Sequence, residues 1–293
     1  MQVKELITQV KKIEIKTRRT VDELCAGAYR SVFKGRGIEF DEVREYTEDD
    51  DVRDIDWNVT ARMGTPYIKK YIEERELNVI IAVDASSSLL FGSKNKTKFE
   101  KAIEISALLT FSAIRNHDKV GLLFFTDKKE FYLPPKSGKP HGMRIIRELL
   151  AQKYPNSKTN ISAALSSLMN LLKKRSVIFL LTDLMDENDF SKEIRIIAKK
   201  HDLIVVRILD RLEKNIPKAC IIELEDSENG DFLSFDARRK ELIENFAKFS
   251  QEIHKRNEDI CKRANADLID IDCTEDILKP LMKFFRMREK FRK

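Results

Sequence analysis

Residues 78–88, NVIIAVDASSS, decide the fold class of this chain. The run from Val79 to Val83 is short, continuous and rich in β-branched residues, which is typical of a strand buried on both faces of a parallel sheet. Asp84 follows the last apolar residue directly, so the first polar side chains stand where the strand leaves the sheet. The stretch therefore predicts a buried strand with a polar site at its carboxyl end.

Apolar runs and helical patterns alternate along the rest of the chain. Apolar residues recur with helical spacing in residues 97–116, 143–152, 161–172, 190–200 and 235–264, and a helix closes the chain. Strands are predicted at residues 120–125, 130–133, 176–181, 203–209 and 267–271, and the second of these is a short edge strand closed by Pro134 and Pro135. This alternation indicates an α/β fold, in which a mostly parallel, Rossmann-like central sheet is flanked by helices and preceded by a smaller N-terminal module.

Composition excludes several classes of protein. The 293 residues suffice for one large domain or two ordinary ones, and the net charge of +6 is too mild to indicate nucleic-acid binding. No stretch approaches the length of an apolar membrane span, and the N-terminus lacks the pattern of a signal peptide. The four cysteines show no CxxC spacing, so we expect neither a zinc site nor a disulfide scaffold, and a cytoplasmic location follows; they are Cys25, Cys220, Cys261 and Cys273.

Oxygen-bearing side chains follow two of the predicted strands. Asp84, Ser86 and Ser88 alternate along the exit of the first strand, Asp183 follows a later strand, and Thr159 precedes a helix. The carboxyl ends of parallel strands share one edge of the sheet, where ligands bind. Oxygen ligands suit a hard cation, Mg²⁺ first, with Ca²⁺ or Mn²⁺ as the other candidates. Each residue alone could equally cap a helix, but their joint placement favours a metal site.

The charge of this set favours docking over catalysis. Two carboxylates balance a divalent cation, so the loaded site keeps affinity for a carboxylate from another molecule. The pattern DxSxS, followed by a threonine and a later aspartate, resembles the metal-ion-dependent adhesion site of von Willebrand A domains across residues 77–210. The resemblance implies that Ser86, Ser88 and Thr159 are direct or near-direct ligands, and that Asp84 and Asp183 act directly or through water. It also implies that an acidic side chain of a protein partner completes the coordination.

A second pattern lies in residues 33–76, where arginines alternate with acidic residues around the only tryptophan. The string GRGIEFDEVREYTEDDDVRDIDWNVTAR at residues 35–62 resembles a segment that precedes the von Willebrand A domain in the domain of unknown function 58 family. Asp49 departs from the glycine that is usual in a turn of that family. The structural alternative is an ion-paired module that packs on the next domain. The functional alternative is a partner-binding surface, with Arg36, Arg44, Asp56, Trp57 and Arg62 as candidates.

Family resemblance also implies a role. Members are often encoded beside MoxR-type AAA+ ATPases, which implies an adaptor for such an ATPase in chaperone-like maturation or stress tolerance. We expect three parts: the module at residues 1–76, a von Willebrand A-type domain at 77–273 and a basic C-terminal helix at 274–293.

Two other functions stay open from the residues alone. A cation held by Asp84 and Asp183 could serve a phosphoesterase, although Ser86 stands where haloacid-dehalogenase-type phosphatases have a second aspartate. The basic, phenylalanine-bearing segment at residues 279–293 could bind a membrane surface or nucleic acid.

Overall fold

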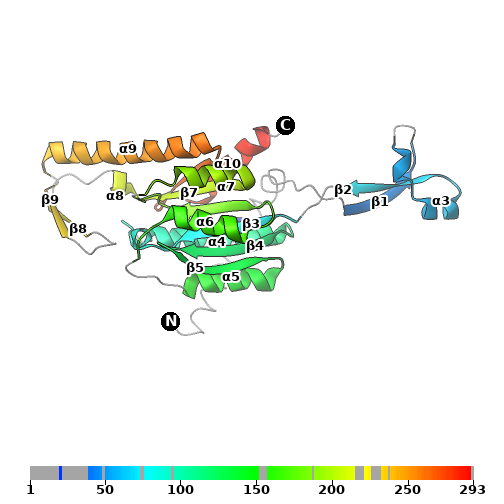
Figure 1. Ribbon diagram of the computed structural model, residues 1–293, viewed down its shortest axis with the longest axis horizontal. Coiled ribbons are helices and arrows are strands. Elements are labelled where there is room, and N and C mark those ends of the chain that lie inside the picture. The colour runs from blue at the N-terminus through cyan, green and yellow to red at the C-terminus, as the bar shows by residue number, and fades with distance from the viewer. Residues whose placement is uncertain are drawn as a thin grey trace.

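The computed structural model describes residues 20–21, 39–47, 50–72, 76–93, 96–151, 157–186, 188–214, 221–225, 232–236 and 238–291. Of the residues discussed above, Cys25, Arg36, Asp49 and Cys220 lie outside this set. Figure 1 shows a central sheet between helices, with a separate small sheet at one end of the molecule.

Six strands form the central sheet in the order β10-β7-β6-β3-β4-β5. All neighbouring pairs are parallel except β4 and β5, so the expected mostly parallel sheet is confirmed. The strands are β3 (Asn78–Asp84), β4 (Lys119–Phe125), β5 (Lys129–Lys136), β6 (Val177–Thr182), β7 (Asp202–Leu209) and β10 (Asp267–Asp272).

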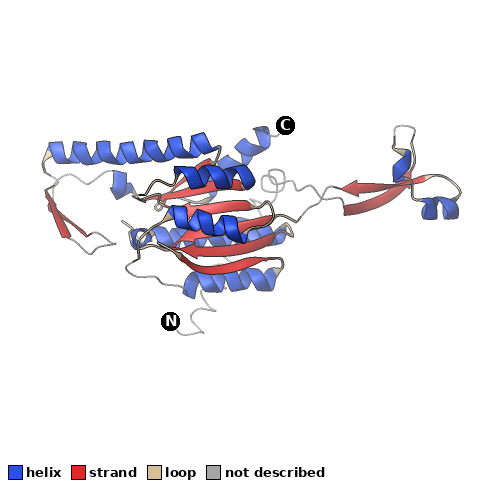
Figure 2. Cartoon of the chain, in the orientation of Figure 1, coloured by secondary structure: helices blue, strands red, loops and turns tan. Residues whose placement is uncertain are grey.

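Helices cover both faces of this sheet, as Figure 2 shows. Because successive side chains of a strand point to opposite faces, β3 serves two cores. Val79, Ile81 and Val83 belong to the core under α4 (Lys98–Arg115), α5 (Lys139–Ala151) and α10 (Leu278–Phe291). Ile80 and Ala82 belong to the core under α6 (Ile161–Leu171), α7 (Ser191–Lys200) and α9 (Lys240–Ala264). Burial on both sides explains why the strand sequence is apolar throughout rather than alternating.

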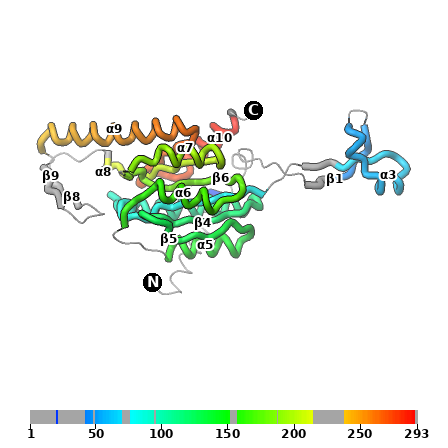
Figure 3. The backbone as a smooth tube through the Cα atoms, viewed as in Figure 1, coloured from blue at the N-terminus to red at the C-terminus, as the bar shows by residue number. Residues whose placement is uncertain are grey.

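A separate antiparallel pair, β1 (Glu39–Glu45) and β2 (Tyr67–Ile72), forms the N-terminal module together with η1 (Val52–Asp54) and α3 (Trp57–Met63). Asp56 caps α3 through its carboxylate, and Gly64 ends the helix in the left-handed conformation at φ 80°. Figure 3 follows the backbone of these elements, which lie apart from the six-stranded sheet. Val21 also falls within the module expected at residues 1–76, but it is buried in the core under α4. A further hairpin joins β8 (Ile221–Glu225) to β9 (Phe232–Asp236).

Several boundaries differ from the sequence-based expectation, such as the start of α5 at Lys139 instead of residue 143, and two of the differences have a clear physical reason. Strand β5 runs through Pro134 and Pro135 to Lys136, because an edge strand tolerates residues that cannot donate a backbone hydrogen bond. The helix expected to begin at residue 235 begins instead at Lys240, since residues 235–236 pair with β8.

The C-terminal helix α10 packs onto the sheet rather than standing free. Leu281, Phe284 and Phe285 are buried and join the same core as α4. Its Arg288 forms ion pairs with Asp202 at the start of β7 and with Asp267 at the start of β10. Two of the phenylalanines that the sequence left available for a membrane surface are therefore used within the fold.

Candidate functional site

The candidate site lies at the carboxyl edge of the sheet, between β3 and β6. The chain runs from β3 to β4 and β5 on one side and then crosses to β6, β7 and β10 on the other. Such a reversal opens a crevice in which parallel sheets bind ligands. Asp84 ends β3, and Asp183 follows β6 directly, so the structure brings both carboxylates to neighbouring strands.

Asp84 is completely buried and holds two hydrogen bonds. Its Oδ1 accepts from the backbone N–H of Ser86 at 3.0 Å, and its Oδ2 accepts from the hydroxyl of Thr182 at 2.8 Å. Burial raises the pKa of Asp84 to about 7, and the nearby charge of Asp183 adds to this effect. Two carboxylates that act on each other's charge in this way favour a positive charge between or beside them.

Three hydroxyls come from two loops that are tied together. Ser86 Oγ and Ser88 Oγ, in the loop that enters η2 (Ser87–Leu90), lie 3.1 Å apart. The Thr159 loop is held against this one because Ser87 and Ser157 exchange two hydrogen bonds of 3.0 Å. Thr159 Oγ1 is buried, and among the described residues it has no hydrogen-bond partner. A buried hydroxyl without a partner is costly, which points to a ligand that this oxygen would contact.

Asp183 makes an ion pair with Lys98, a residue that the sequence analysis did not single out. Lys98 Nζ lies 2.6 Å from Asp183 Oδ2 and 2.5 Å from Glu213 Oε1, which α8 (Arg211–Lys214) supplies. Burial alone would lower the pKa of Lys98, but the two carboxylates outweigh it and the pKa lies above its ordinary value. One sequence signal existed: a lysine directly after the N-cap Thr97 opposes the helix dipole and needs a compensating carboxylate.

The backbone after Asp183 is constrained by its surroundings. Leu184 is buried and left-handed, with φ 59°, a conformation that costs a leucine roughly 1–2 kcal/mol. Its N–H donates to Thr182 Oγ1, and its carbonyl accepts from the Asn257 side chain of α9 at 3.1 Å. Met185 N–H donates to Asp183 Oδ1 at 3.0 Å. These contacts fix the turn that carries the Asp183 carboxylate, and local sequence patterns carry no signal for this turn.

The donor set fits a hard divalent cation in kind. It combines two carboxylates with three hydroxyls, of which Thr159 Oγ1 is unpartnered within the described part of the chain. Among the described residues, no group of three or more His, Cys, Asp or Glu side chains is placed to hold a metal. A cation here would therefore depend on Asp84 and Asp183 together with hydroxyl oxygens. When bound, it would supply an open position for an outside oxygen ligand.

The candidate partner-binding residues of the N-terminal module divide into two kinds. Arg44 forms a two-pronged ion pair with Asp50, and Asp56 caps α3 and lies 3.4 Å from Lys69 Nζ, so both stabilise the module itself. Trp57, by contrast, is 67% exposed, and Arg62 is also exposed. Exposed Val52 and Met63 accompany them.

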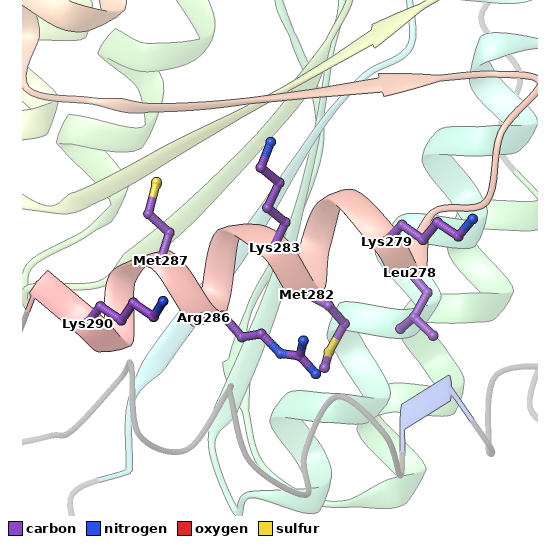
Figure 4. Close-up of a pocket in the computed structure, with 7 residues that line it drawn as sticks. All are labelled: Leu278, Lys279, Met282, Lys283, Arg286, Met287 and Lys290. Atoms are coloured by element: carbon purple, nitrogen blue, oxygen red, sulfur yellow. The ribbon is translucent and has the colours of Figure 1, made fainter.

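A basic groove runs along α10, as Figure 4 shows. Its volume is about 630 Å³. The lining combines apolar and cationic side chains: Leu278, Lys279, Met282, Lys283, Arg286, Met287 and Lys290. The groove could accept an anionic, partly apolar ligand, and none of the described side chains that line it carries an oxygen ligand for a cation.

Within the described residues, none of the helices is long and apolar enough to cross a membrane. Of the four cysteines, Cys261 and Cys273 are described, and both are free and buried.

This chain is similar in sequence to a mycobacterial protein and in fold to solved structures. It is 24% identical over 288 residues to the uncharacterized protein Rv1480 of Mycobacterium tuberculosis, an alignment covering 98% of this chain and 90% of that protein. Among solved structures, the conserved hypothetical protein BatB from Bacteroides thetaiotaomicron is 18% identical, with a TM-score of 0.49, covering 73% of this chain and 99% of that one. The SpRpn10 VWA domain is 10% identical, with a TM-score of 0.39, covering 72% and 95%.

Family membership agrees with both sequence patterns. The described sheet, with helices on both faces and one antiparallel edge strand, has the architecture expected of a von Willebrand A-type domain. The model of the family described as "Protein of unknown function DUF58" matches residues 42–256, most of the chain, and this protein belongs to that family.

Proposed function

We propose that this protein is a divalent-cation-dependent protein-binding module and not an enzyme. The cation is Mg²⁺, with Ca²⁺ or Mn²⁺ as substitutes, and the partner offers an acidic side chain. We further propose that the protein works in the cytoplasm as an adaptor for a MoxR-type AAA+ ATPase, in chaperone-like maturation or stress tolerance. The ATPase and the pathway come from the family resemblance.

The observation that supports this proposal best is the Thr159 hydroxyl, unpartnered among the described residues, at the same sheet edge as two buried carboxylates. Asp84, Asp183 and the hydroxyls of Ser86 and Ser88 already have partners in the protein, so the site is ordered before any ligand arrives. Thr159 Oγ1, unpartnered among the described residues, is the atom that lacks a contact. An ordered oxygen site with an unmet hydroxyl suits a bound cation better than a helix cap.

Exposed apolar side chains beside the site support a protein partner. Leu90 is 52% exposed and Phe91 is 41% exposed, and both lie close after Ser88 in the sequence. Apolar residues around a polar anchor are typical of protein interfaces rather than of sites for small anions.

The test is Mg²⁺-dependent capture of the purified MoxR-type ATPase encoded in the same genome. Asp84→Asn should weaken capture in Mg²⁺ at least about tenfold, because it removes one of the two ligand charges. Asp272→Asn is a matched control, since Asp272 ends β10 at the same sheet edge but accepts hydrogen bonds from the backbone N–H and the hydroxyl of Thr274, outside the site. Equal capture by Asp84→Asn and the unmodified protein, or capture that survives EDTA unchanged, would remove the cation from the mechanism.

The exposed face of α3 supplies a second contact surface in this proposal. Trp57→Ser should weaken capture of the ATPase both in Mg²⁺ and in EDTA, because it removes a large apolar contact and no cation ligand. The midpoint temperature of thermal unfolding should change by no more than about 1–2 °C, since an exposed side chain contributes little to stability. Full capture by this variant would restrict the contact surface to the sheet edge.

A phosphoesterase is the enzyme alternative. It predicts Mg²⁺- or Mn²⁺-dependent turnover of generic phosphoesters that is lost in Asp84→Asn, and such turnover would replace the present proposal.

The basic groove on α10 favours one further candidate, peripheral contact with an anionic membrane surface or nucleic acid. Lys283→Glu with Arg286→Glu should abolish sedimentation with anionic vesicles or retention on DNA at low salt, because both side chains are exposed. Absence of binding by the unmodified protein would dispose of this candidate.

A further inference from the structure

The first turn of α4 places a buried lysine inside the candidate site. The Lys98 side chain is 1% exposed, and its ammonium contacts Asp183 Oδ2 and Glu213 Oε1. A cation that binds Asp183 would therefore share this carboxylate with a positive charge that belongs to the protein. The capping box of Thr97 and Glu100 already stabilises the start of α4, so the ammonium of Lys98 plays no part in capping this helix.

Charge counting shows what the lysine changes. When ionised, Asp84, Asp183 and Glu213 carry three negative charges and Lys98 carries one positive charge, so these four groups sum to −2. Buried Asp210, close enough to Lys98 to feel its charge, is left out of this sum because its carboxylate accepts from backbone N–H groups. That sum matches a divalent cation. Without Lys98 the sum would be −3, and the site would attract the cation more strongly but would stay negative once loaded. A loaded site of net negative charge repels a partner's carboxylate.

We propose that Lys98 is a tethered competitor of the divalent cation, which lowers cation affinity and leaves the loaded site neutral enough to accept an acidic side chain. This inference rests on the proposed function. It predicts that cation affinity follows the summed charge of the cluster, because Coulomb interactions in a buried site are weakly screened.

The experiment is isothermal titration of the full chain with Mg²⁺, and with Mn²⁺ as a second probe, over four proteins. The expected order of affinity is Lys98→Met tightest, then the unmodified protein together with Lys98→Met/Glu213→Gln, then Glu213→Gln weakest. Each unit of cluster charge should change Kd by about tenfold, and the double variant should lie within about threefold of the unmodified protein. Lys101→Met is the matched control, because Lys101 is a buried lysine of the same helix whose ammonium bonds the carbonyl of Glu275 instead of a site carboxylate.

A purely structural role for Lys98 makes the opposite forecast. Removal of a structural bridge would loosen the site and weaken cation binding, so unchanged or weaker binding by Lys98→Met overturns the inference. If Lys98→Met does not fold in EDTA, the comparison of Glu213→Gln with the double variant makes the same test, since the two proteins differ only at residue 98. Tighter binding by the double variant of that pair supports the inference, and equal or weaker binding overturns it.

Failure of this inference can be told apart from failure of the proposed function. Cation binding that is lost in Asp84→Asn but is equal in Lys98→Met and the unmodified protein removes the role of Lys98 alone. Absence of binding in the unmodified protein and in every variant removes both. Binding by Lys98→Met alone supports the competition and would mean that Lys98 stands in for the cation in the natural protein.

Discussion

The unpartnered hydroxyl of Thr159 offers a way to separate ligand binding from stability. Thr159→Val replaces a hydroxyl that, among the described residues, has no partner, so the free energy of unfolding in EDTA should stay within about 0.5 kcal/mol. Thr182→Val should lower the free energy of unfolding by about 1–3 kcal/mol, because the Thr182 hydroxyl donates to Asp84 and accepts from Leu184 N–H. Urea unfolding measures both values. Added Mg²⁺ should raise the free energy of unfolding of the unmodified protein by more than it raises that of the Thr159→Val variant. An equal increase in both proteins would show that Thr159 is not a ligand.

His201 should make stability depend on pH. Burial lowers the pKa of His201 to about 4, and nearby Lys200 and Arg175 act in the same direction. Its Nδ1 accepts a hydrogen bond from Ser176 N–H at 3.2 Å, which requires the neutral ring. The unfolded chain, with a histidine pKa near 6.5, therefore binds more protons than the folded chain between about pH 6.5 and pH 4, and stability falls as the pH falls through this window.

The corresponding measurement is urea unfolding of the unmodified protein and of His201→Asn across that window. The variant should lose less stability between pH 6.5 and pH 4, because it has no ring to protonate. Parallel pH profiles for the two proteins would contradict the assignment.

Helix α4 connects local sequence to the geometry of the site. Thr97 Oγ1 accepts from Glu100 N–H, and Glu100 Oε2 accepts from Thr97 N–H, both at 3.1 Å. Thr97→Ala should lower the free energy of unfolding by about 1 kcal/mol, whereas Thr97→Ser should keep the cap and change it by only a few tenths. Because this cap sets where the helix begins, it also sets where Lys98 enters the crevice. Equal destabilisation by the two variants would mean that the methyl group, not the hydroxyl, matters.

Across the whole molecule, the C-terminal helix contributes to the main core. Phe285 is completely buried with Leu281 against the sheet, so Phe285→Ala should lower the free energy of unfolding by about 3–5 kcal/mol. Met287 on the exposed side of the same helix is the control, and Met287→Ala should cost well under 1 kcal/mol. Guanidinium unfolding followed by circular dichroism measures both. A small decrease in the free energy of unfolding of Phe285→Ala would mean that the packing of α10 contributes little to the stability of the core.

Local sequence patterns were enough to predict the mostly parallel sheet. They were also enough to predict that Asp84 and Asp183 lie at the same edge of it. A strand buried on both faces must be apolar throughout, and its carboxyl end must turn polar, so a few consecutive residues carry the information. The same patterns could not tell which residues of the N-terminal module hold its own structure, as Arg44 and Asp56 do, and which face solvent, as Trp57 does. That distinction depends on burial.

The electrostatics of the site depend on contacts between distant parts of the chain. Lys98 meets Asp183 across 85 residues and Glu213 across 115, and Asn257 holds the carbonyl of Leu184 across 73. These residues become neighbours only when α4, α8 and α9 have packed on the sheet, because no local spacing or periodicity links them. The placement of oxygen-bearing side chains at one sheet edge could therefore be predicted from the sequence, whereas the positive charge of Lys98 beside Asp183 became visible only in the packed fold.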